Sequence, residues 1–286
     1  MILNSYNIGR SLLAIGLLLT LTFNSNYTLF GLVVENHSNI LFDYNLFSIL
    51  KDNLVLAKTL SILVLITVIL GFYPRVTGIL QWYITYSFFM SADVVDGGDH
   101  IASNLTLLLI PLTLIDNNKN HWFENNTPNK IFTYLKNSIF LLISIQVCAI
   151  YLHAFIGKLF VEEWKNGTAI YYWLTHNHFG VNPIFKNLTI SILSNKFIVI
   201  LITWGTLLLE FLLSSCILLS KNDKKRYLFL FLGIIFHFSI IIIHGLVSFF
   251  FTMSAALFLY LVPNNKNYLL KQLKNKKTWK QFLNQF

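Results

Sequence analysis

Charged side chains are scarce in this sequence. Asp, Glu, Lys and Arg make up 12% of its 286 residues, about half of the roughly 25% that a soluble globular domain carries. Proline is also rare, with five residues, and the two cysteines, Cys148 and Cys216, lie in apolar runs and form no CxxC pair. The composition therefore excludes an ordinary soluble domain and a dithiol redox centre, and both cysteines are expected to be small buried side chains.

Several sequence signals are missing as well. No small-residue A-x-A cleavage site follows the first apolar run, so this run is predicted to remain as a membrane span rather than leave as a signal peptide. There is no serine or zinc protease motif, and no ligand pattern predicts a metal site. The net charge is +9, but the positive residues are spread over short loops and the C-terminal end, which argues against nucleic acid as a partner.

Apolar runs of membrane-spanning length dominate the rest of the chain. A spanning helix needs about 20 residues and at least about 17. The sequence therefore predicts an all-α, polytopic integral membrane bundle of about eight spans, in which 54–73 and 76–92 form a hairpin at Tyr73-Pro74-Arg75. The segments 76–92, 100–115 and 247–262 are near the lower limit and are expected to span or to pack inside the bundle. The expected spans are 8–30, 54–73, 76–92, 100–115, 131–157, 196–219, 227–245 and 247–262.

Positive charges predict the orientation of this bundle. With eight spans and the N-terminus inside, 15 of the 21 Lys and Arg residues fall on the cytoplasmic side. The opposite face keeps six of them together with 8 of the 12 acidic residues. The positive-inside rule therefore favours a cytoplasmic N-terminus and a cytoplasmic C-terminus.

Two regions differ from the apolar spans. Residues 166–195 are too polar to span and predict two short interfacial helices on the outer face, separated by a turn at 180–183. Residues 264–286 are rich in Lys and Asn, with leucines and aromatics at helical spacing. We therefore divide the chain into a transmembrane domain, 1–263, and a basic amphipathic tail, 264–286, which is expected to lie on the anionic cytoplasmic leaflet.

Ionisable residues inside spans are costly and are candidates for function. His237 and His244 are seven residues apart in FHFSIIIIHGL, nearly two helical turns, so both project from one helix face. They are expected either to bond to neighbouring helices or to line a site. Glu210 lies on a polar stripe that should face the bundle interior, and it acts either as a structural hydrogen-bonding carboxyl or as a proton carrier. The other members of this stripe are Thr203, Thr206 and Ser214.

Lys158 ends a long apolar run in YLHAFIGKLFVEEW. Glu162 is four residues further on, so an ordinary ion pair within one helix is one interpretation. A lysine near a membrane boundary can also extend its ammonium to the interface. In a low-dielectric pocket, however, a lysine can lose its proton and serve as a base or a nucleophile.

The loop DGGDH, residues 96–100, is unusually polar for this chain. Its glycines allow a turn, and Asp99 can cap a helix that starts at His100. The alternative is that Asp96, Asp99 and His100 form one wall of a site. His176, in a loop of the 166–195 region, is a weaker case of the same kind.

Four stretches together resemble a known family. YLHAFIGKLFVEEWKNGTAIYY contains Lys-Leu, an acid before Trp, and Gly-Thr-Ala-aromatic, and the others are IGRSLLAIGLLLTLTFN, GGDHI and FHxxIxxxHGLxxFxxxM. Their order and spacing resemble the horizontally transferred transmembrane (HTTM) domain family, which includes the vitamin-K-dependent gamma-carboxylases, over nearly the whole chain. Within it, the opening residues are most similar to the sporulation-delaying-protein B group, bacterial membrane proteins needed to mature a secreted peptide toxin.

The resemblance implies a multi-pass protein of the bacterial cell membrane with its site toward the extracytoplasmic side. Lys158 takes the position of the catalytic base and His237 that of the membrane histidine. The sequence departs from the carboxylases where Gly157 precedes Lys158 and Phe160 follows Leu159, and their large soluble domain is not expected here. A lysine base that acts on a substrate other than that of vitamin K carboxylation is therefore expected.

Three functions remain open at this point. The first is maturation of a secreted precursor peptide at the outer face, with a small soluble partner subunit. The second is a carboxylase-like or quinone-linked membrane enzyme, with quinone as the cofactor considered and no metal. The third is non-enzymatic transport or immunity. The residues assigned to the site are Lys158, His237, Glu210 and His244 as catalytic, and Asp96, Asp99, His100, His153, Trp164 and His176 as substrate-binding.

Overall fold

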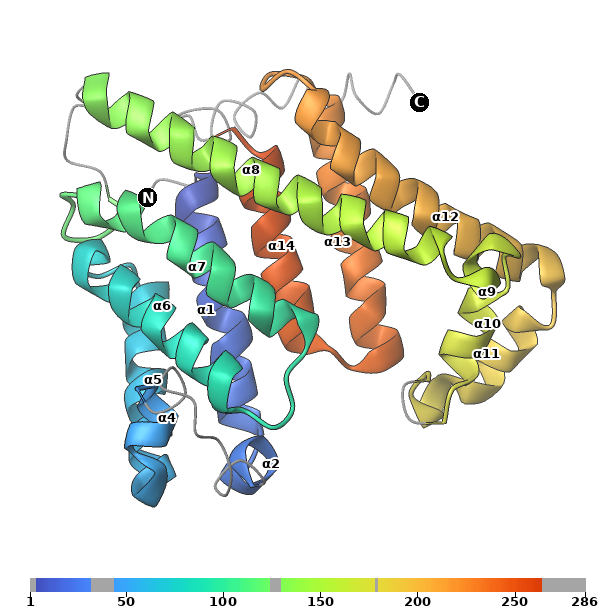
Figure 1. Cartoon of the computed structure of the whole chain (residues 1–286), viewed down its shortest axis with the longest axis horizontal. Coiled ribbons are helices and arrows are strands. Elements are labelled where there is room, and N and C mark those ends of the chain that lie inside the picture. The colour runs from blue at the N-terminus through green and yellow to red at the C-terminus, as the bar shows by residue number, and fades with distance from the viewer. Residues whose placement is uncertain (1–3, 32–43, 124–129, 178–179, 264–286) are drawn as a thin grey trace.

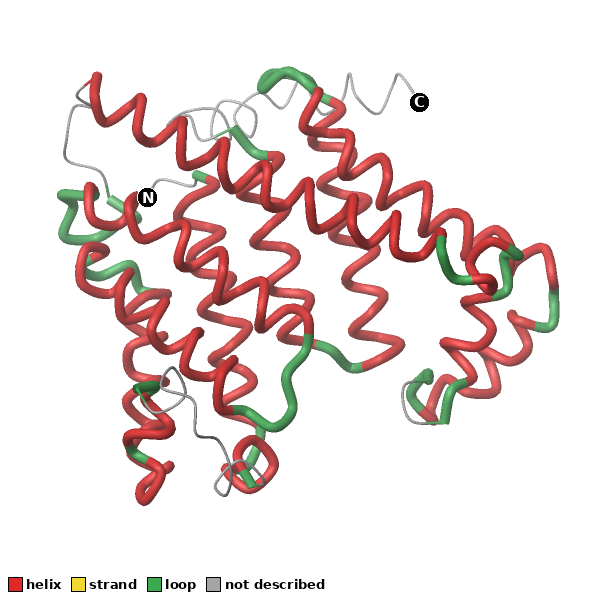
Figure 2. Tube along the Cα trace, in the orientation of Figure 1, coloured by secondary structure: helices red, strands yellow, loops and turns green. Residues whose placement is uncertain are grey.

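The computed structural model describes residues 4–31, 44–123, 130–177 and 180–263, and these residues are helical nearly throughout (Figure 1, Figure 2). Within them the only β-type pairing is an isolated bridge between Phe72 and Asn120. The all-α prediction is confirmed. The α-helices are α1 (Ser5–Phe23), α2 (Asn26–Phe30), α4 (Leu46–Ile49), α5 (Leu54–Ile69), α6 (Pro74–Ser91), α7 (Gly97–Ile115), α8 (Lys130–Leu159), α9 (Glu162–Lys165), α10 (Ala169–Thr175), α11 (Lys186–Leu193), α12 (Lys196–Ser215), α13 (Lys225–His244) and α14 (Val247–Leu261), and the 3₁₀ helices are η2 (Lys51–Asn53), η3 (Pro183–Phe185) and η4 (Cys216–Leu218).

Six described helical segments are long and apolar enough to cross a membrane. The predicted segment 100–115 is among them because α7 begins three residues earlier, at Gly97. Two other predicted spans form helices but are not among the six, since α6 carries polar residues and α14 has 15 residues. The six segments are Ser5–Phe23, Lys51–Ile69, Gly97–Ile115, Thr133–Leu159, Lys196–Leu218 and Lys225–His244.

The first predicted span, 8–30, is two helices rather than one. α1 ends at Phe23, and the Ser25 hydroxyl accepts a hydrogen bond from the Thr28 N–H at 3.0 Å to start α2. A serine N-cap of this kind satisfies a free amide of the new helix and separates it from the preceding one. The carbonyl of Asn24 is also occupied, because it accepts from Lys58 Nζ at 2.7 Å.

Two other sequence predictions are confirmed locally. α5 and α6 are adjacent helices joined by a turn in which Gly71 and Tyr73 have positive φ. The region 166–195 contains two short helices, α10 and α11, with η3 between them. The proposed amphipathic helix at 264–286 lies outside the described residues.

α1 and α14 form the central antiparallel pair of the bundle. Gly9 lies against Leu259, while Gly16 lies against Ser248 and Phe251. Glycines at these positions let two helix backbones approach closely, as is common where lipid supplies no hydrophobic driving force between helices. The start of α1 and the end of α14 are therefore at the same end of the bundle, and Figure 1 shows α8 crossing this pair at an oblique angle.

Arg10 is fully buried in α1, with 0% of its surface exposed. Its guanidinium donates to Thr77 Oγ1 at 2.6 Å and to Gln81 Oε1 at 3.1 Å, and its Nη1 lies 3.1 Å from His121 Nδ1. Asn7 Nδ2 donates to the His121 carbonyl at 2.6 Å. This network joins α1 to α6 and to the 116–123 connection. Arg10 is therefore an interior residue, although the positive-inside count treated it as a loop charge.

Gly78→Ala should destabilise the protein. A Cβ at Gly78 would collide with the Thr113 side chain on α7, and overpacking of this kind costs about 1–3 kcal/mol. Gly205→Ala in α12 is the matched control, because a Cβ there meets no atom within 4 Å and alanine should stabilise the helix by about 0.5–1 kcal/mol. Thermal unfolding of the purified protein in detergent measures both effects, and equal effects would contradict close packing of α6 on α7.

The stability should depend on pH through His121. Burial and the neighbouring Arg10 guanidinium lower the pKa of His121 from 6.5 to about 3. Between these values the unfolded chain binds one proton more than the folded chain, so the free energy of unfolding should fall as the pH drops through this window. From pH 7 to pH 5 the loss from this group is about 2 kcal/mol, at about 1.4 kcal/mol per pH unit below 6.5.

His121→Gln tests this dependence, because glutamine keeps an acceptor for Arg10 but does not titrate. The difference in unfolding free energy between pH 7 and pH 5 should shrink by about 2 kcal/mol in the variant. Denaturant titration of the detergent-solubilised protein at the two pH values measures this difference. An identical pH dependence in both proteins would mean that His121 is not held neutral.

Candidate functional site

The ammonium group of Lys158 forms an ion pair with Glu210. Lys158 is the penultimate residue of α8, and its Nζ lies 2.7 Å from Oε1 and 2.9 Å from Oε2 of Glu210 on α12. The Glu210 side chain is 7% exposed and the Lys158 side chain 25%. Glu162, the partner suggested by the i+4 spacing, instead lies 3.6 Å from Lys165. The charge of Lys158 is therefore neutralised from another helix, within the protein.

Trp164 covers one side of this ion pair. The Lys158 Nζ lies 5.4 Å from the centroid of the Trp164 ring, a cation–π distance. The chain reaches this position because α9 follows α8 after a two-residue turn, and Gly167, with φ of 75°, then leads into α10. A Cβ at Gly167 would lie 3.0 Å from Trp204 Nε1, so both conformation and space favour glycine there.

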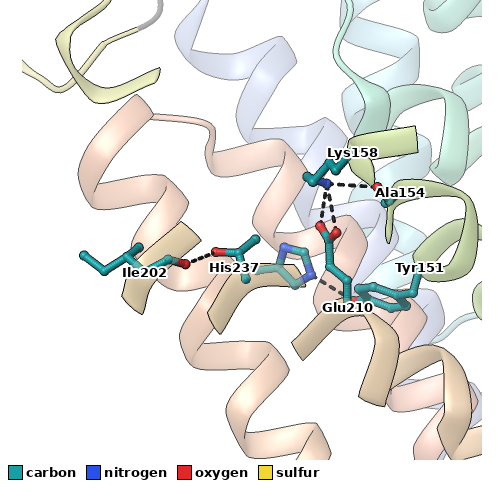
Figure 3. A network of polar contacts seen from close by, with 7 residues as sticks. Tyr151, Ala154, Lys158, Ile202, Glu210 and His237 are labelled. Atoms are coloured by element: carbon teal, nitrogen blue, oxygen red, sulfur yellow. Dashed lines mark hydrogen bonds and ion pairs between the residues drawn. The ribbon is translucent and has the colours of Figure 1, made fainter. Parts of the chain in front are cut away.

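Tyr151 and His237 form a second polar pair. Tyr151 Oη lies 2.8 Å from His237 Nε2, and both residues are 2% exposed. His237 Nδ1 has no hydrogen-bond partner among the described residues. Figure 3 shows the two pairs side by side, with Tyr151 and Lys158 contributed by α8, Glu210 by α12 and His237 by α13. Tyr151 was not among the residues assigned to the site from the sequence, although its spacing of seven residues from Lys158 places both side chains on one face of a helix.

The DGGDH loop is a capped helix start. The Asp96 carboxylate accepts from the N–H groups of Gly98 at 2.7 Å and Asp99 at 3.0 Å, and the Asp99 carboxylate accepts from the Asp96 N–H at 3.0 Å. The prediction that Asp99 caps a helix beginning at His100 is wrong: Asp96 is the N-cap, α7 begins at Gly97, and Asp99 is the third residue of a capping box. The carboxylates are thus occupied by the α7 N-terminus.

Phe249 connects this loop to the histidine pair. A Cβ at Gly98 would lie 2.9 Å from Phe249 Cα, so only glycine permits this approach of α14 to α7. The Phe249 ring meets the His237 ring edge-on, with centroids 5.5 Å apart. Ser248 Oγ, in the same turn of α14, donates to Asp96 Oδ2 at 3.1 Å. Phe249 therefore contacts both the loop and His237.

The other predicted site residues lie apart from these pairs. His153 is on an exposed face of α8, and His100 is exposed and stacked on Phe89 at 4.9 Å. His244 ends α13, and the exposed His176 is the C-cap of α10. In the stripe of α12, Thr203, Glu210 and Ser214 are buried as predicted, while Thr206 is only partly buried. No group of three or more His, Cys, Asp or Glu side chains that could hold a metal occurs in the described ranges.

This arrangement permits proton transfer without a change in net charge. A proton that moves from Lys158 to Glu210 converts the ion pair into a neutral amine and a neutral carboxyl group, which a low-dielectric environment tolerates better than separated charges. The neutral amine of Lys158 has a free electron pair and is the form that acts as a base or nucleophile. Tyr151 and His237 add a second donor–acceptor pair next to it.

Comparison with known proteins places the chain in a family. No family model matches it, and no solved structure matches it. It is 34% identical to the protein YitO of Bacillus subtilis (strain 168) over a 292-residue alignment that covers 96% of this chain and 91% of YitO. It is 38% identical to Sporulation-delaying protein SdpB of the same organism over 270 residues, 92% of this chain and 83% of SdpB.

The chain belongs to the SdpB family. The resemblance to the sporulation-delaying-protein B group is thereby confirmed at the level of sequence. Together with six long apolar helices, this family membership identifies a multi-pass membrane protein.

Replacing one member of the ion pair should lower the free energy of unfolding more than replacing both members. Lys158→Met leaves the Glu210 carboxylate buried without a partner, and loss of one member of a buried pair costs about 3–5 kcal/mol. The double variant Lys158→Met/Glu210→Gln removes both charges and should recover much of this loss. A double-mutant cycle on thermal unfolding in detergent measures the coupling. Additive effects of the two substitutions would show that the pair is not coupled.

Proposed function

We propose that this SdpB-family protein takes part in the maturation or modification of a secreted precursor peptide, such as a toxin or bacteriocin, at the outer face of the bacterial cell membrane. The observation that carries the proposal is the Lys158–Glu210 ion pair beside Tyr151 and His237, because transfer of the Lys158 proton to Glu210 leaves a neutral amine, which is the form of lysine that acts as a base. The resemblance of its motifs to the HTTM family supports the same assignment, since Lys158 takes the position of the catalytic lysine in that family.

We further propose eight spans with both termini in the cytoplasm. The antiparallel contact of α1 with α14 supports this topology, because it brings the start of α1 and the end of α14 to the same end of the bundle. An even number of membrane crossings likewise places both termini on the same side of the membrane. The end of the bundle that holds the 220–226 loop, with Lys221, Lys224 and Lys225, would then face the cytoplasm.

In this proposal Lys158 removes a proton from the substrate after passing its own proton to Glu210. The ammonium that results is stabilised by the Trp164 ring, and Glu210 then gives its proton to the leaving group of the substrate or to water, which restores the ion pair. In the tautomer with its hydrogen on Nε2, His237 donates to Tyr151 Oη, and its Nδ1 then offers a second proton acceptor. Asp96 and Asp99 maintain the start of α7 behind Phe249 rather than acting on the substrate directly.

Lys158→Arg is the decisive variant for this mechanism. Arginine keeps a positive charge for Glu210 but does not lose its proton at physiological pH. The full chain is expressed with a secreted precursor peptide, and a peptide encoded beside its gene is the first choice. The amount of mass-shifted or trimmed peptide should fall by about 10²-fold or more in the variant, because this is the usual contribution of a general base. Peptide mass spectrometry of the culture medium measures the product.

Lys165→Arg is the matched control, because Lys165 is exposed and pairs only with Glu162 in the described structure. It should leave the product unchanged. Equal product from the Lys158→Arg variant and the wild-type chain would overturn the role of Lys158 as a base. Protection of the cell from the peptide without any change in peptide mass would instead favour the non-enzymatic immunity function, and a quinone bound to the purified protein would favour the quinone-linked enzyme.

A further inference from the structure

A cavity of about 740 Å³ lies at the far end of α8 from Lys158. Its walls come from the first half of α8, from η4 and the loop that follows it, and from the end of α14. These elements meet beside the start of α13, where Figure 1 shows α8 passing the upper ends of α12 and α14. Volumes of about 300–1,000 Å³ are typical of sites for small organic ligands.

The lining of this cavity is amphipathic. The polar part of the wall consists of Asn137 and Ser138 of α8 and of Ser220 and Lys221 in the loop that follows η4. Apolar wall comes from Leu141, one turn further along α8 than Asn137, and from Ile217, Leu259 and Val262. A ligand that fits both parts must carry a polar group and a hydrocarbon portion.

The charge at the polar part of the cavity is positive. Arg226 lines it and is buried, and its guanidinium donates to the carbonyls of Leu261 at 3.0 Å, Leu219 at 3.1 Å and Cys216 at 3.2 Å and to that of Tyr260. No carboxylate lies within 4.0 Å of this guanidinium in the described part of the chain. Its positive charge is therefore solvated by carbonyl dipoles but not neutralised.

Lys221 adds a second cation at the same cavity. It is exposed, whereas the nearby Asp223 is no part of the cavity wall and accepts from the Lys225 N–H at 2.9 Å. The cavity thus combines one buried cation and one exposed cation with apolar wall at the end of a membrane-embedded bundle. An anionic headgroup joined to an acyl chain is complementary to these features.

We propose that this cavity binds an anionic phospholipid of the surrounding bilayer, with the phosphate at Lys221 and Arg226 and part of an acyl chain against Leu141 and Ile217. Basic recesses between membrane helices are general sites for acidic lipid headgroups. The proposal stands independently of the peptide-maturation function, because it uses none of the residues of the Lys158 site.

Lipid titration of the purified full-length protein tests the proposal. The protein is stripped of lipid in a neutral detergent, and its thermal unfolding midpoint is followed while phosphatidylglycerol is added. The midpoint should rise and saturate, since a ligand that binds only the folded state stabilises it. Phosphatidylcholine, which carries no net charge, should give little or no rise at the same mole fraction.

Two pairs of variants locate the effect. Lys221→Ala should raise the half-saturating phosphatidylglycerol fraction by about fivefold, the equivalent of about 1 kcal/mol for one cation beside an acidic lipid, while Lys186→Ala, at another exposed lysine, should not. Ser138→Phe should weaken binding by filling the cavity, while Leu142→Phe, on the same helix but outside the cavity lining, should not.

Three results would overturn the proposal. The first is an equal response to phosphatidylglycerol and phosphatidylcholine, and the second is an unchanged half-saturation in both Lys221→Ala and Ser138→Phe. The third is competition by millimolar inorganic phosphate that abolishes the phosphatidylglycerol effect, which would assign the cavity to a free phosphate instead of a lipid.

Discussion

Every charge buried in this bundle has to be solvated by the protein itself, and the described structure is organised around that constraint. The hydrocarbon core of the bilayer cannot hydrogen-bond a guanidinium, an ammonium or a carboxylate, so each such group needs partners on neighbouring helices. Arg10 connects α1 to α6 and to His121, the Lys158–Glu210 pair connects α8 to α12, and Arg226 connects α13 to the ends of η4 and α14. Three buried charge sites thus join most of the long helices.

The candidate site is a consequence of the same constraint. A lone lysine at the end of α8 would extend to the interface, but Glu210 holds it beside Tyr151 and His237. The pairing that stabilises the bundle therefore also places a potential base next to an aromatic–histidine pair. The neighbouring Phe249 and Gly98 contact extends this arrangement to the start of α7, which explains why the sequence combines polarity and glycine in that loop.

Much of the fold could be read from the sequence, because apolar run length and helix caps are local properties. The helical class, the hairpin of α5 and α6 and the short helices of 166–195 follow from such signals. The partner of Lys158 did not, since the nearby Glu162 satisfied the spacing rule while Glu210 lies 52 residues away in the chain. The interior place of Arg10 was missed for the same reason, because its acceptors on α6 and at His121 are distant in sequence.

The N-cap of α7 could not be assigned from the local sequence alone. Both Asp96 and Asp99 are suitable N-caps, and the choice between them depends on how far the helix extends toward the turn. The contact of Gly98 with Phe249 fixes that extent, since it requires the glycine to lie within the first turn of α7 against α14. Tertiary packing therefore determines which carboxylate caps the helix and which completes the capping box.

The order of the paired charges along the chain has a consequence for biogenesis. Glu210 lies well inside α12, where a charge costs a few kcal/mol to insert, about 2.5–3.5 on the translocon scale for Asp. Its partner Lys158 is synthesised first and is already available on α8 when α12 leaves the ribosome. The order is reversed for Arg10, because α1 is synthesised before α6 and His121, which supply its hydrogen-bond partners. The native contacts of Arg10 can therefore form only after α6 and residue 121 have been synthesised.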